Sequence, residues 1–573
     1  MKKFDDMDAT PKPIAGVVYA PPEQTQYYRK NGALGQESLG SALHNACNQY
    51  ADRTALIAPD EQLSYRQLDE LSDQTGAALL ELGLKPQDRV IFQIENTVEI
   101  FFLLYGCFKV GVIPVCTLAS HREHEIAHLA EFTGARAHFI QADISGIDML
   151  AFAENIRDKV GTLEHIVTVR GESGEHGNSV IALKDAMARI DVKAAREVVS
   201  ATHIHPDDVA LFQLSGGTTG IPKVIPRFHA EYIHNSLCYA IAADFTENSI
   251  AHWPLPAIHN AAMVQFNLPI HLTGGALAVQ RSHATKDFFG MIQRHRVTHS
   301  GAALPLIVRA IDSGTIGDYD LSSLIDFVSL GESELVANEL HLPANHIFGM
   351  AEGLCMRSRS DDPLAVRSSM IGRPLSPFDE VKIVDPRTGD EVQCGEVGEF
   401  WARGPYTTRG YYDATEYNAG KFSTDGFYQT GDLMKAHVID DVTYFSFEGR
   451  TKDNIDRGME KISAEELERE IIHHDSVREV YCVAMPDREY GEKVCAYIIT
   501  KQDFAGLTVP QLGRFLGTRG VAKFKWPEHV ELVDTFPTTK VGKTSKALLR
   551  EDITRKLVTA GRLPPSYLQQ YDQ

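Results

Sequence analysis

The sequence predicts an α/β protein with a large N-terminal domain of doubly wound sheets, a small β-rich subdomain and a small α+β C-terminal domain. Three observations support this fold class. Helical and strand patterns alternate through residue 330, glycine-punctuated strands follow from about residue 375, and a polar stretch at residues 449–453 precedes a new helix. At 573 residues the chain is also too long for one compact core.

The alternation is clear at residues 65–84, where apolar positions recur at helical spacing and the run closes with Gly83. Residues 89–94 then predict a buried strand, and residues 276–279 and 327–330 predict further strands of the same kind. Strands that alternate with helices are typical of parallel sheets covered on both faces. No fixed-period repeat interrupts this pattern.

The predicted β-rich subdomain covers about residues 375–449. Short strands are expected at residues 380–384, 398–402 and 441–446, each close to a glycine or a turn-forming residue. This pattern fits a small antiparallel unit better than a continuation of the doubly wound sheets.

A C-terminal domain is predicted to begin after the polar stretch. Ser463 and Glu466 form a capping box that opens a helix through Ile472. Strands at residues 480–483 and 494–499 follow. The predicted domains are an N-terminal core of residues 1–449, a hinge at 450–453 and a C-terminal domain of residues 454–573.

Composition excludes several classes of protein. The formal net charge of −21 argues against nucleic acid as a partner, because such binding depends on clustered basic residues. The eight cysteines form no C-x-x-C pair and no zinc spacing, which is typical of reduced, mostly buried thiols. Residues 1–8 lack the apolar region of a signal peptide, and residues 100–116, interrupted by Lys109, are too short to span a bilayer. We expect a soluble cytoplasmic enzyme without a membrane partner.

A glycine-rich loop at residues 215–223 predicts a polyphosphate-binding site. Its glycines let backbone N–H groups approach phosphate oxygens, its hydroxyls add donors, and its lysine adds a positive charge. The buried strand predicted at residues 208–214 places the loop at a strand's carboxyl end. It is not a Walker A loop, because Ile221 and Pro222 separate the last glycine from the lysine. The loop contains Ser215, Gly216, Gly217, Thr218, Thr219, Gly220 and Lys223.

With five further motifs in the same order, this loop makes the chain resemble the adenylate-forming superfamily of acyl-CoA synthetases, peptide-synthetase adenylation domains and luciferases. The six motifs lie at residues 215–223, 348–352, 395–399, 428–432, 449–450 and 542–543. Within the superfamily the likeness is strongest to stand-alone aryl-acid AMP ligases of siderophore-type pathways. It rests on residues 119–126, 259–260, 348–353 and 403–412, with Ala351 where general acyl-CoA synthetases usually have threonine.

The resemblance implies ATP and Mg²⁺ as cofactors. Lys543 resembles the mobile lysine that bridges the acid and the α-phosphate, and Thr218 belongs to the catalytic phosphate loop. Glu352 fits the magnesium ligand, since hard cations on phosphates take carboxylate oxygens. Phe348 resembles the aromatic residue that stacks on adenine, and Asp432 fits the ribose position.

Two more residues receive roles from the resemblance. Arg450 is expected to assist at the ribose or the phosphates, or else to form an interdomain salt bridge. Lys452, two residues later, matches the family's hinge, about which the small domain turns between adenylation and thiol transfer. No carrier domain with an attachment serine is visible in the sequence, so the thiol is expected on a separate aryl carrier protein or on free CoA.

The acid-binding residues implied by the resemblance start with the pair His259 and Asn260, where aryl-acid ligases recognise the substrate. A buried amide there discriminates strongly, because an unpaired polar group is costly. The full predicted set is His259, Asn260, Ala261, Gln265, Gly331, Glu332, Ala351 and Cys355.

Four departures from the family pattern bear on the partners. Ala261 replaces a common tyrosine, and Gln265 stands where a serine recognises a second ring hydroxyl, which argues against dihydroxybenzoate. Glu332 interrupts the family's Gly-Gly-Ala segment, so either it meets an amino substituent or it points to solvent. Met459 replaces a glycine in the loop thought to border the thiol's approach. We expect an aromatic acid with an ortho donor or acceptor, for example an amino- or alkyl-substituted hydroxybenzoate or a heteroaromatic acid.

The predicted function is ATP-dependent activation of an aromatic acid as an acyl adenylate, with release of pyrophosphate. Transfer to a carrier-protein phosphopantetheine would serve siderophore or other nonribosomal peptide biosynthesis. The alternatives are an aryl-CoA ligase and an inactive ligand-binding relative, which the presence of Lys543, Glu352 and Asp432 argues against.

Overall fold

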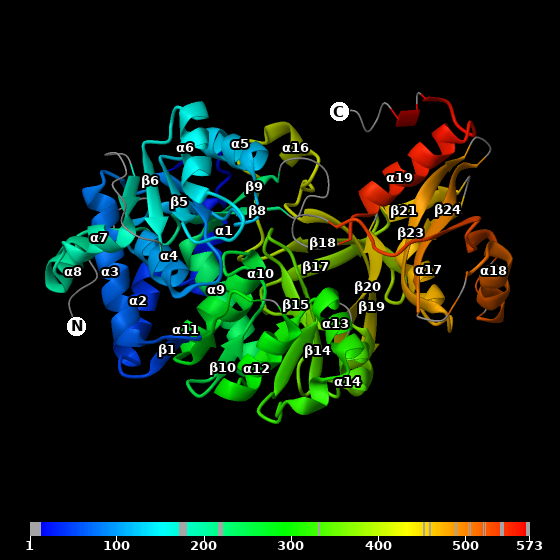
Figure 1. Ribbon diagram of the computed structural model, residues 1–573, viewed down its shortest axis with the longest axis horizontal. Helices are drawn as coiled ribbons and strands as arrows, with labels where there is room; N and C mark the ends of the chain where they lie inside the picture. Colours follow the sequence, from blue (N-terminus) through cyan, green and yellow to red (C-terminus); the bar gives the residue numbers. More distant parts are fainter. Residues whose placement is uncertain are drawn as a thin grey trace. The chain divides into compact units, whose positions relative to one another are not determined.

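A computed structural model provides the coordinates of the chain (Figure 1). It describes residues 13–170, 180–215, 222–282, 284–329, 333–450, 453–457, 460–487, 490–501, 504, 506–519, 521, 523–538, 544–565 and 567–568.

Packing divides the chain into two compact units. The first comprises residues 1–216, 221–381 and 402–428, and the second comprises residues 217–220, 382–401 and 429–573. The predicted hinge at 450–453 falls within the second unit, and it stays a prediction.

The first unit contains a seven-stranded sheet in the order β7-β6-β5-β3-β4-β8-β9. Neighbouring strands run parallel except β8 and β9, which form an antiparallel pair at the edge. The strands are β3 (Arg89–Gln93), β4 (Ile113–Val115), β5 (Ala137–Gln141), β6 (His165–Val169), β7 (Val180–Ala182), β8 (Val209–Leu214) and β9 (Val224–Phe228).

Helices cover both faces of this sheet because successive side chains of a strand point in opposite directions (Figure 1). On β3, Val90 and Phe92 pack into the cluster that holds α3 and α4, whereas Ile91 packs with α5 and α6. The helices of this region are α1 (Pro22–Lys30), α2 (Leu39–Gln49), α3 (Tyr65–Glu81), α4 (Val98–Val110), α5 (Glu123–Thr133), α6 (Met149–Lys159), α7 (Leu183–Ala188) and α8 (Val192–Ser200).

A nine-stranded sheet, also in the first unit, has the order β16-β15-β14-β13-β12-β10-β11-β1-β2. Its six central strands run parallel, and β2, β15 and β16 add antiparallel pairs at its ends. The strands are β1 (Thr54–Ile57), β2 (Gln62–Ser64), β10 (Ile250–His252), β11 (Ala276–Ala278), β12 (His299–Ala302), β13 (Asp326–Ser329), β14 (Ala344–Gly349), β15 (Cys355–Arg357) and β16 (Arg373–Pro374).

One apolar cluster connects the two sheets. Tyr232 from α9 and Leu268 from α11 share it with Phe92 of the seven-stranded sheet and Leu277 of the nine-stranded sheet. The helices around the nine-stranded sheet are α9 (His229–Ala242), α10 (Asn260–Ala262), the π-helical turn η1 (Met263–Asn267), α11 (Leu268–Thr273), α12 (Thr285–His295), α13 (Leu304–Ser313), the 3₁₀ turn η2 (Ile316–Asp318), α14 (Ser333–Glu339) and α15 (Leu364–Ser369). A further short helix, α16 (Thr415–Ala419), belongs to the first unit.

The second unit is mainly β-structure. A four-stranded sheet has the order β17-β18-β19-β20, and a second sheet has the order β22-β21-β24-β23 with β25 paired to β24. The strands are β17 (Glu380–Val384), β18 (Val397–Arg403), β19 (Tyr428–Ile439), β20 (Val442–Arg450), β21 (Asn454–Arg457), β22 (Glu460–Ser463), β23 (Val477–Asp487), β24 (Gly491–Thr500) and β25 (His529–Leu532).

The long hairpin of β23 and β24 carries an apolar cluster on each face. Val494 and Ala496 pack with α17 (Ala464–Ile471) and α18 (Val509–Thr518), whereas Cys495 packs with α19 (Lys546–Thr559). A short 3₁₀ turn, η4 (Lys523–Lys525), precedes β25. Ser463 caps α17 as predicted, since its Oγ accepts the N–H of Glu466.

The structure confirms the predicted α/β class, with helix and strand alternation followed by β-rich structure. The helix predicted at residues 65–84 is α3, which ends at Glu81 before a left-handed Gly83. All eight cysteines are free and seven are buried, as expected of reduced thiols.

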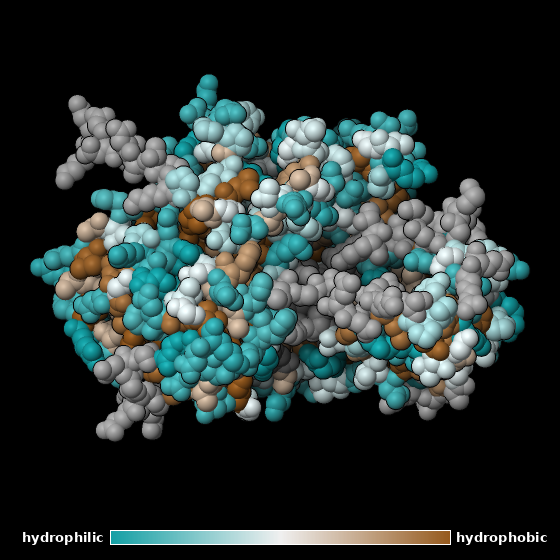
Figure 2. All heavy atoms as spheres, turned by 90° about the horizontal axis from the view of Figure 1, so that it is seen from above, coloured by the Kyte–Doolittle hydropathy of each residue, from teal (hydrophilic) through white to brown (hydrophobic). Residues whose placement is uncertain are grey.

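The surface carries no extended apolar belt on the face drawn in Figure 2, where apolar residues lie scattered among hydrophilic ones. Isolated exposed apolar residues such as Ile241 and Leu364 are normal on a folded protein. Among the described residues, none of the helices combines the length and hydropathy needed to cross a bilayer.

Candidate active site

Asn260 is held in a fixed orientation by its neighbours. Its Oδ1 accepts from the Tyr232 hydroxyl at 2.8 Å and from Arg227 Nη1 at 3.3 Å. Its Nδ2 donates to the Met350 carbonyl at 3.3 Å. Two donors on one side of the amide identify that side as oxygen, so the nitrogen is the group that remains for another acceptor.

His259 and Ala261 begin the helical segment that carries Asn260. The Ala261 N–H donates to His259 Nδ1 at 3.3 Å, so His259 caps α10. Both residues are half-buried, whereas Asn260 is buried. The predicted pair therefore lies at a helix start, where backbone N–H groups are available to a ligand.

A π-helical turn, η1, follows directly and contains Gln265. The Leu268 N–H bonds to the Met263 carbonyl, five residues earlier. Pro269 has no N–H for the carbonyl four residues before it, that of Gln265, and its ring disfavours a regular α-helical turn there. The wider turn accommodates the proline, and such turns recur at functional sites.

Gln265 faces the predicted substrate residues from this turn. It is 2% exposed, and its Nε2 lies 3.7 Å from Cys355 Sγ. Its Oε1 is buried and has no hydrogen-bond partner among the residues that the structure describes. Burial raises the pKa of the Cys355 thiol to about 12, so that side chain stays neutral. Gln265 thus offers a buried acceptor that a ligand's N–H or O–H group could satisfy.

Glu352 lies in the turn between β14 and β15, directly after the half-buried Ala351. Tyr411 Oη donates to Glu352 Oε1 at 2.6 Å, and the Thr408 N–H donates to the Glu352 carbonyl at 2.6 Å. The Tyr428 hydroxyl lies 2.8 Å from that of Tyr411. Burial is the main cause of a raised pKa at Tyr411, so its phenol remains a donor.

The base of the predicted phosphate loop is closed by two hydrogen bonds. The Ser215 N–H donates to the Lys223 carbonyl at 2.9 Å, and the Lys223 N–H donates to Ser215 Oγ at 3.0 Å. The loop therefore joins the antiparallel strands β8 and β9. Lys223 is exposed, with Nζ 4.2 Å from the centre of the Tyr417 ring.

The structure thus gathers part of the predicted site. Within the first unit, Asn260 meets the segment before Glu352, and Gln265 meets Cys355. Phe348 lies half-buried on β14. Asp432 and Arg450 are paired positions on β19 and β20 of the second unit. The predictions at Gly216, Gly217, Thr218, Thr219, Gly220, Gly331, Glu332, Lys452, Met459 and Lys543 lie outside the described residues.

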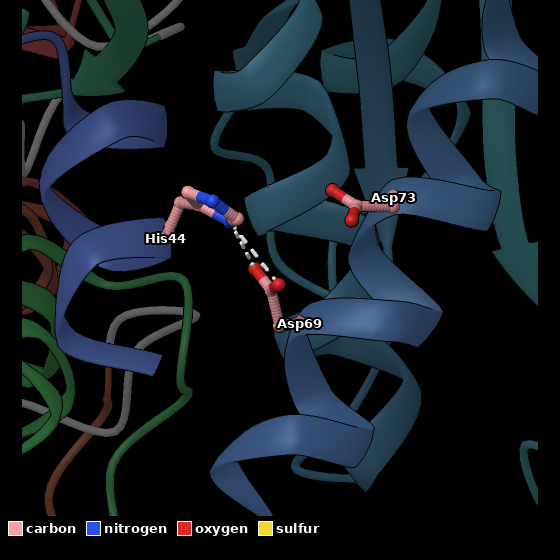
Figure 3. A group of neighbouring side chains, drawn as sticks. All are labelled: His44, Asp69 and Asp73. Carbon is pink, nitrogen blue, oxygen red and sulfur yellow. Dashed lines mark hydrogen bonds and ion pairs between the residues drawn. The ribbon is translucent and has the colours of Figure 1, made fainter. Parts of the chain in front are cut away.

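A separate cluster of His44, Asp69 and Asp73 has the spacing of metal ligands (Figure 3). Cationic side chains already occupy it. Lys109 Nζ lies 2.7 Å from Asp69 and 2.6 Å from Asp73, and Arg196 contacts both carboxylates. The cluster is an ion-pair network that joins α2, α3, α4 and α8, and we assign it no metal.

Sequence reasoning missed three polar residues of the site: Arg227, Tyr232 and Tyr411. Arg227 lies in an otherwise apolar strand, β9, which is an unusual place for a charge and was the available signal. The two tyrosines have no comparable signal, because tyrosine is common in apolar cores.

Comparison with known proteins places this geometry in a family. The AMP-binding enzyme family matches residues 43–412, and the AMP-binding enzyme C-terminal domain matches residues 466–543. The 2,3-dihydroxybenzoate-AMP ligase of Bacillus subtilis is 37% identical, over 95% of this chain and 99% of its own. A salicylyl-CoA synthase / salicylate adenylyltransferase of a Streptomyces species is 33% identical, over 94% and 98%.

A solved structure agrees with the sequence relatives. The apo structure of Mycobacterium smegmatis MbtA is 32% identical and superposes with a TM-score of 0.70, over 94% of this chain and 98% of its own. Fold and relatives together define an adenylate-forming ligase. The chain belongs to the AMP-binding enzyme family. Both the predicted superfamily and the likeness to aryl-acid AMP ligases are confirmed.

Proposed function

We propose that this enzyme activates an aromatic carboxylic acid with ATP and passes the acyl group to the phosphopantetheine thiol of a separate carrier protein. The setting that fits is siderophore or other nonribosomal peptide biosynthesis. The names of the relatives, a dihydroxybenzoate-AMP ligase and a salicylate adenylyltransferase, support the substrate class. The observation that carries the proposal is the buried pair of Asn260 and Gln265. Asn260 Nδ2 has one hydrogen left for a ligand, and Gln265 Oε1 is available as an acceptor.

On the acid side, Asn260 would donate from Nδ2 to the substrate carboxylate or to an ortho oxygen. Gln265 would accept a hydrogen bond at Oε1 from a ring hydroxyl or amino group, because this oxygen has no partner in the described part of the protein. Both demands are met by hydroxy- and aminobenzoates. An acid whose ring carries no donor would leave the Gln265 oxygen unpaired, so we expect such an acid to bind more weakly.

On the nucleotide side, the proposal assigns the β- and γ-phosphates to residues 215–223. Phe348 would stack on adenine, Asp432 would accept from the ribose hydroxyls, and Arg450 would assist at the ribose or phosphates. Lys543 would bridge the attacking carboxylate and the α-phosphate, where negative charge develops. Turning about Lys452 would then withdraw Lys543 before thiol transfer.

The residues present fit a magnesium ion at Glu352. This carboxylate is 9% exposed, pairs with no cation in the described part of the chain and accepts a hydrogen bond from the Tyr411 hydroxyl. A largely buried carboxylate without a counter-ion is costly, and a hard cation is the ligand it suits. When bound, Mg²⁺ would neutralise phosphate charge during pyrophosphate release.

The test is ATP–pyrophosphate exchange with salicylate, anthranilate, 2,3-dihydroxybenzoate, benzoate and hexanoate. We expect exchange with hydroxy- or aminobenzoates, weaker exchange with benzoate and none with hexanoate. Lys543→Ala should abolish it, whereas Lys540→Ala, three residues earlier, is the matched control. Strongest exchange with hexanoate and none with aromatic acids would refute the substrate assignment.

A second candidate is an aryl-CoA ligase, favoured by the relative named as both a CoA synthase and an adenylyltransferase. The two candidates share the adenylation step and differ in the thiol. Mass spectrometry of the thioester formed from the acyl adenylate separates the two candidates. One arm of the experiment supplies CoA, and the other supplies a phosphopantetheinylated aryl carrier protein. Thioester formation only with CoA would overturn the carrier assignment.

A further inference from the structure

Arg227 is a fully buried cation that makes no ion pair with any residue the structure describes. It lies on β9 with 0% of its surface exposed. Its guanidinium donates to Asn260 Oδ1 at 3.3 Å, to the Ala351 carbonyl at 2.8 Å and to the Tyr406 carbonyl at 3.0 Å. Its Nε is buried and has no partner in the part of the chain that the structure describes. All three acceptors are neutral, which is unusual because buried charges are normally paired.

The carboxylates near Arg227 are engaged elsewhere. Glu231 forms a buried ion pair with Arg409, and Glu352 accepts a tyrosine hydroxyl. The remaining close contact is the ring of Tyr232, whose centre lies 4.9 Å from the guanidinium carbon. Burial lowers the pKa of Arg227, but an arginine remains charged near neutral pH. Among the described residues, the site therefore holds a positive charge that no carboxylate contacts.

This charge lies directly behind the amide that the acid is proposed to meet. Arg227 and Tyr232 both donate to Asn260 Oδ1, which fixes the amide plane and turns Nδ2 away from them. One Nδ2 hydrogen is taken by the Met350 carbonyl, and the other is left for a ligand. A cation on the oxygen side of an amide also polarises it, so the free N–H becomes a stronger donor.

Arg227 also links the two sides of the reaction. Its bond to the Ala351 carbonyl holds the residue directly before Glu352, the proposed magnesium ligand. The same guanidinium therefore positions Asn260 on the acid side and the turn at Glu352 on the phosphate side. A lysine could supply the charge but not three separate donors in one plane.

We propose that Arg227 is a positioning and specificity residue: it orients Asn260 toward the substrate carboxylate, and its unpaired charge makes the pocket prefer an anionic acid over a neutral analogue. The inference rests on the proposed function, because it takes an aromatic carboxylate as the ligand. In this proposal Arg227 selects ligands by their charge, whereas Gln265 selects them by a hydrogen-bond donor on the ring.

The experiment compares Arg227→Met, Arg227→Lys and Tyr232→Phe with the wild type. Binding of salicylate and of its neutral carboxamide, salicylamide, is measured by calorimetry, and KM for salicylate and ATP by pyrophosphate exchange. For Arg227→Met we expect KM for salicylate to rise about tenfold or more and KM for ATP to rise by a smaller factor, because the turn at Glu352 loses only one of its contacts. The preference for salicylate over salicylamide should fall to about one. Arg227→Lys should retain part of that preference.

Tyr232→Phe removes the other donor to Asn260 Oδ1 and keeps the charge of Arg227. It should therefore weaken the binding of both salicylate and salicylamide while preserving the preference for salicylate. If Arg227→Met does not fold, Tyr232→Phe and Arg227→Lys still decide the test. An unchanged preference and an unchanged KM for salicylate in folded Arg227 variants, with only a lower melting temperature, would show a purely structural role. Absence of exchange in the wild type with every aromatic acid would instead refute the proposed function.

Discussion

Tyr411 Oη donates a 2.6 Å hydrogen bond to Oε1 of Glu352, across 59 residues of sequence. The bond joins two of the segments that carry the resemblance to aryl-acid ligases, residues 348–353 and 403–412. It fixes one oxygen of a largely buried carboxylate, so the other oxygen has a defined direction. If Glu352 holds the proposed magnesium ion, the tyrosine would act on that ion through the orientation of its ligand.

Tyr411→Phe should therefore weaken the binding of magnesium more than the binding of ATP or of the acid. We expect the Mg²⁺ concentration for half-maximal pyrophosphate exchange to rise about tenfold, because loss of a ligand-orienting hydrogen bond typically costs 10- to 100-fold in affinity. Tyr412→Phe is the control, since it removes a neighbouring hydroxyl that does not bond to Glu352. Equal Mg²⁺ dependence in both variants would contradict the role of Tyr411.

Gly353 is expected to tolerate no side chain. Its φ is +126°, and an added Cβ would lie 1.9 Å from the carbonyl oxygen of Tyr406. Gly353→Ala should lower the melting temperature by several degrees and reduce exchange, because the turn that carries Glu352 must move. Gly146→Ala is the matched control: its φ is +82° but no atom lies within 4 Å. A similar effect of both variants would show that backbone strain alone, without the close approach, explains the loss.

Lys109 should be essential to stability and not replaceable by a metal. Lys109→Met leaves Asp69 and Asp73 buried with Arg196 as their remaining strong cation, and we expect a loss of about 3–5 kcal/mol. Lys159→Met, which breaks an exposed pair with Glu123, should leave the free energy of unfolding almost unchanged. Denaturant unfolding of both variants measures the difference.

A separate melting experiment tests whether the cluster of His44, Asp69 and Asp73 is an ion-pair network or a metal site. Addition of Zn²⁺ or Mn²⁺ should not raise the melting temperature of the wild type, because Lys109 occupies the space between the carboxylates. A metal-dependent increase that disappears in Asp73→Asn would show that the cluster is a metal site after all.

The parts of the fold that could be predicted are those with local signals. The strand at residues 380–384 coincides with β17, and Ser463 caps α17, because side-chain alternation and capping act within a few residues. The π-turn around Gln265 was missed: its amino acids have no distinctive period, although Pro269 marks the place where a regular helix is disturbed.

The missed part of the site depends on contacts that are distant in sequence. Arg227 bonds to carbonyls 124 and 179 residues away, and backbone carbonyls leave no trace in residue identity. Asn260 and Gln265 could be singled out by resemblance, but the free Gln265 oxygen and the fixed Asn260 amide required coordinates.

Asp379 gives the fold a measurable pH dependence. Its Oδ1 is buried and has no partner among the described residues, while Oδ2 accepts from the Tyr406 hydroxyl at 2.5 Å and from the Ser376 N–H at 3.1 Å. Burial raises the pKa of the carboxyl from 3.8 to about 7, against the opposing effect of these hydrogen bonds. The folded state therefore binds a proton more tightly than the unfolded state.

The sign of the effect follows from that difference in pKa. Between about pH 4 and pH 7 the folded protein holds the proton and the unfolded chain releases it, so the free energy of unfolding falls as pH rises. Asp379→Asn keeps an oxygen acceptor for Tyr406 and cannot ionise. The variant should melt close to the wild type at pH 4, exceed it increasingly up to pH 7 and keep a constant advantage above, worth about 1–4 kcal/mol. Other titrating groups cancel in the comparison, and a gap that does not change with pH would show that Asp379 has an ordinary pKa.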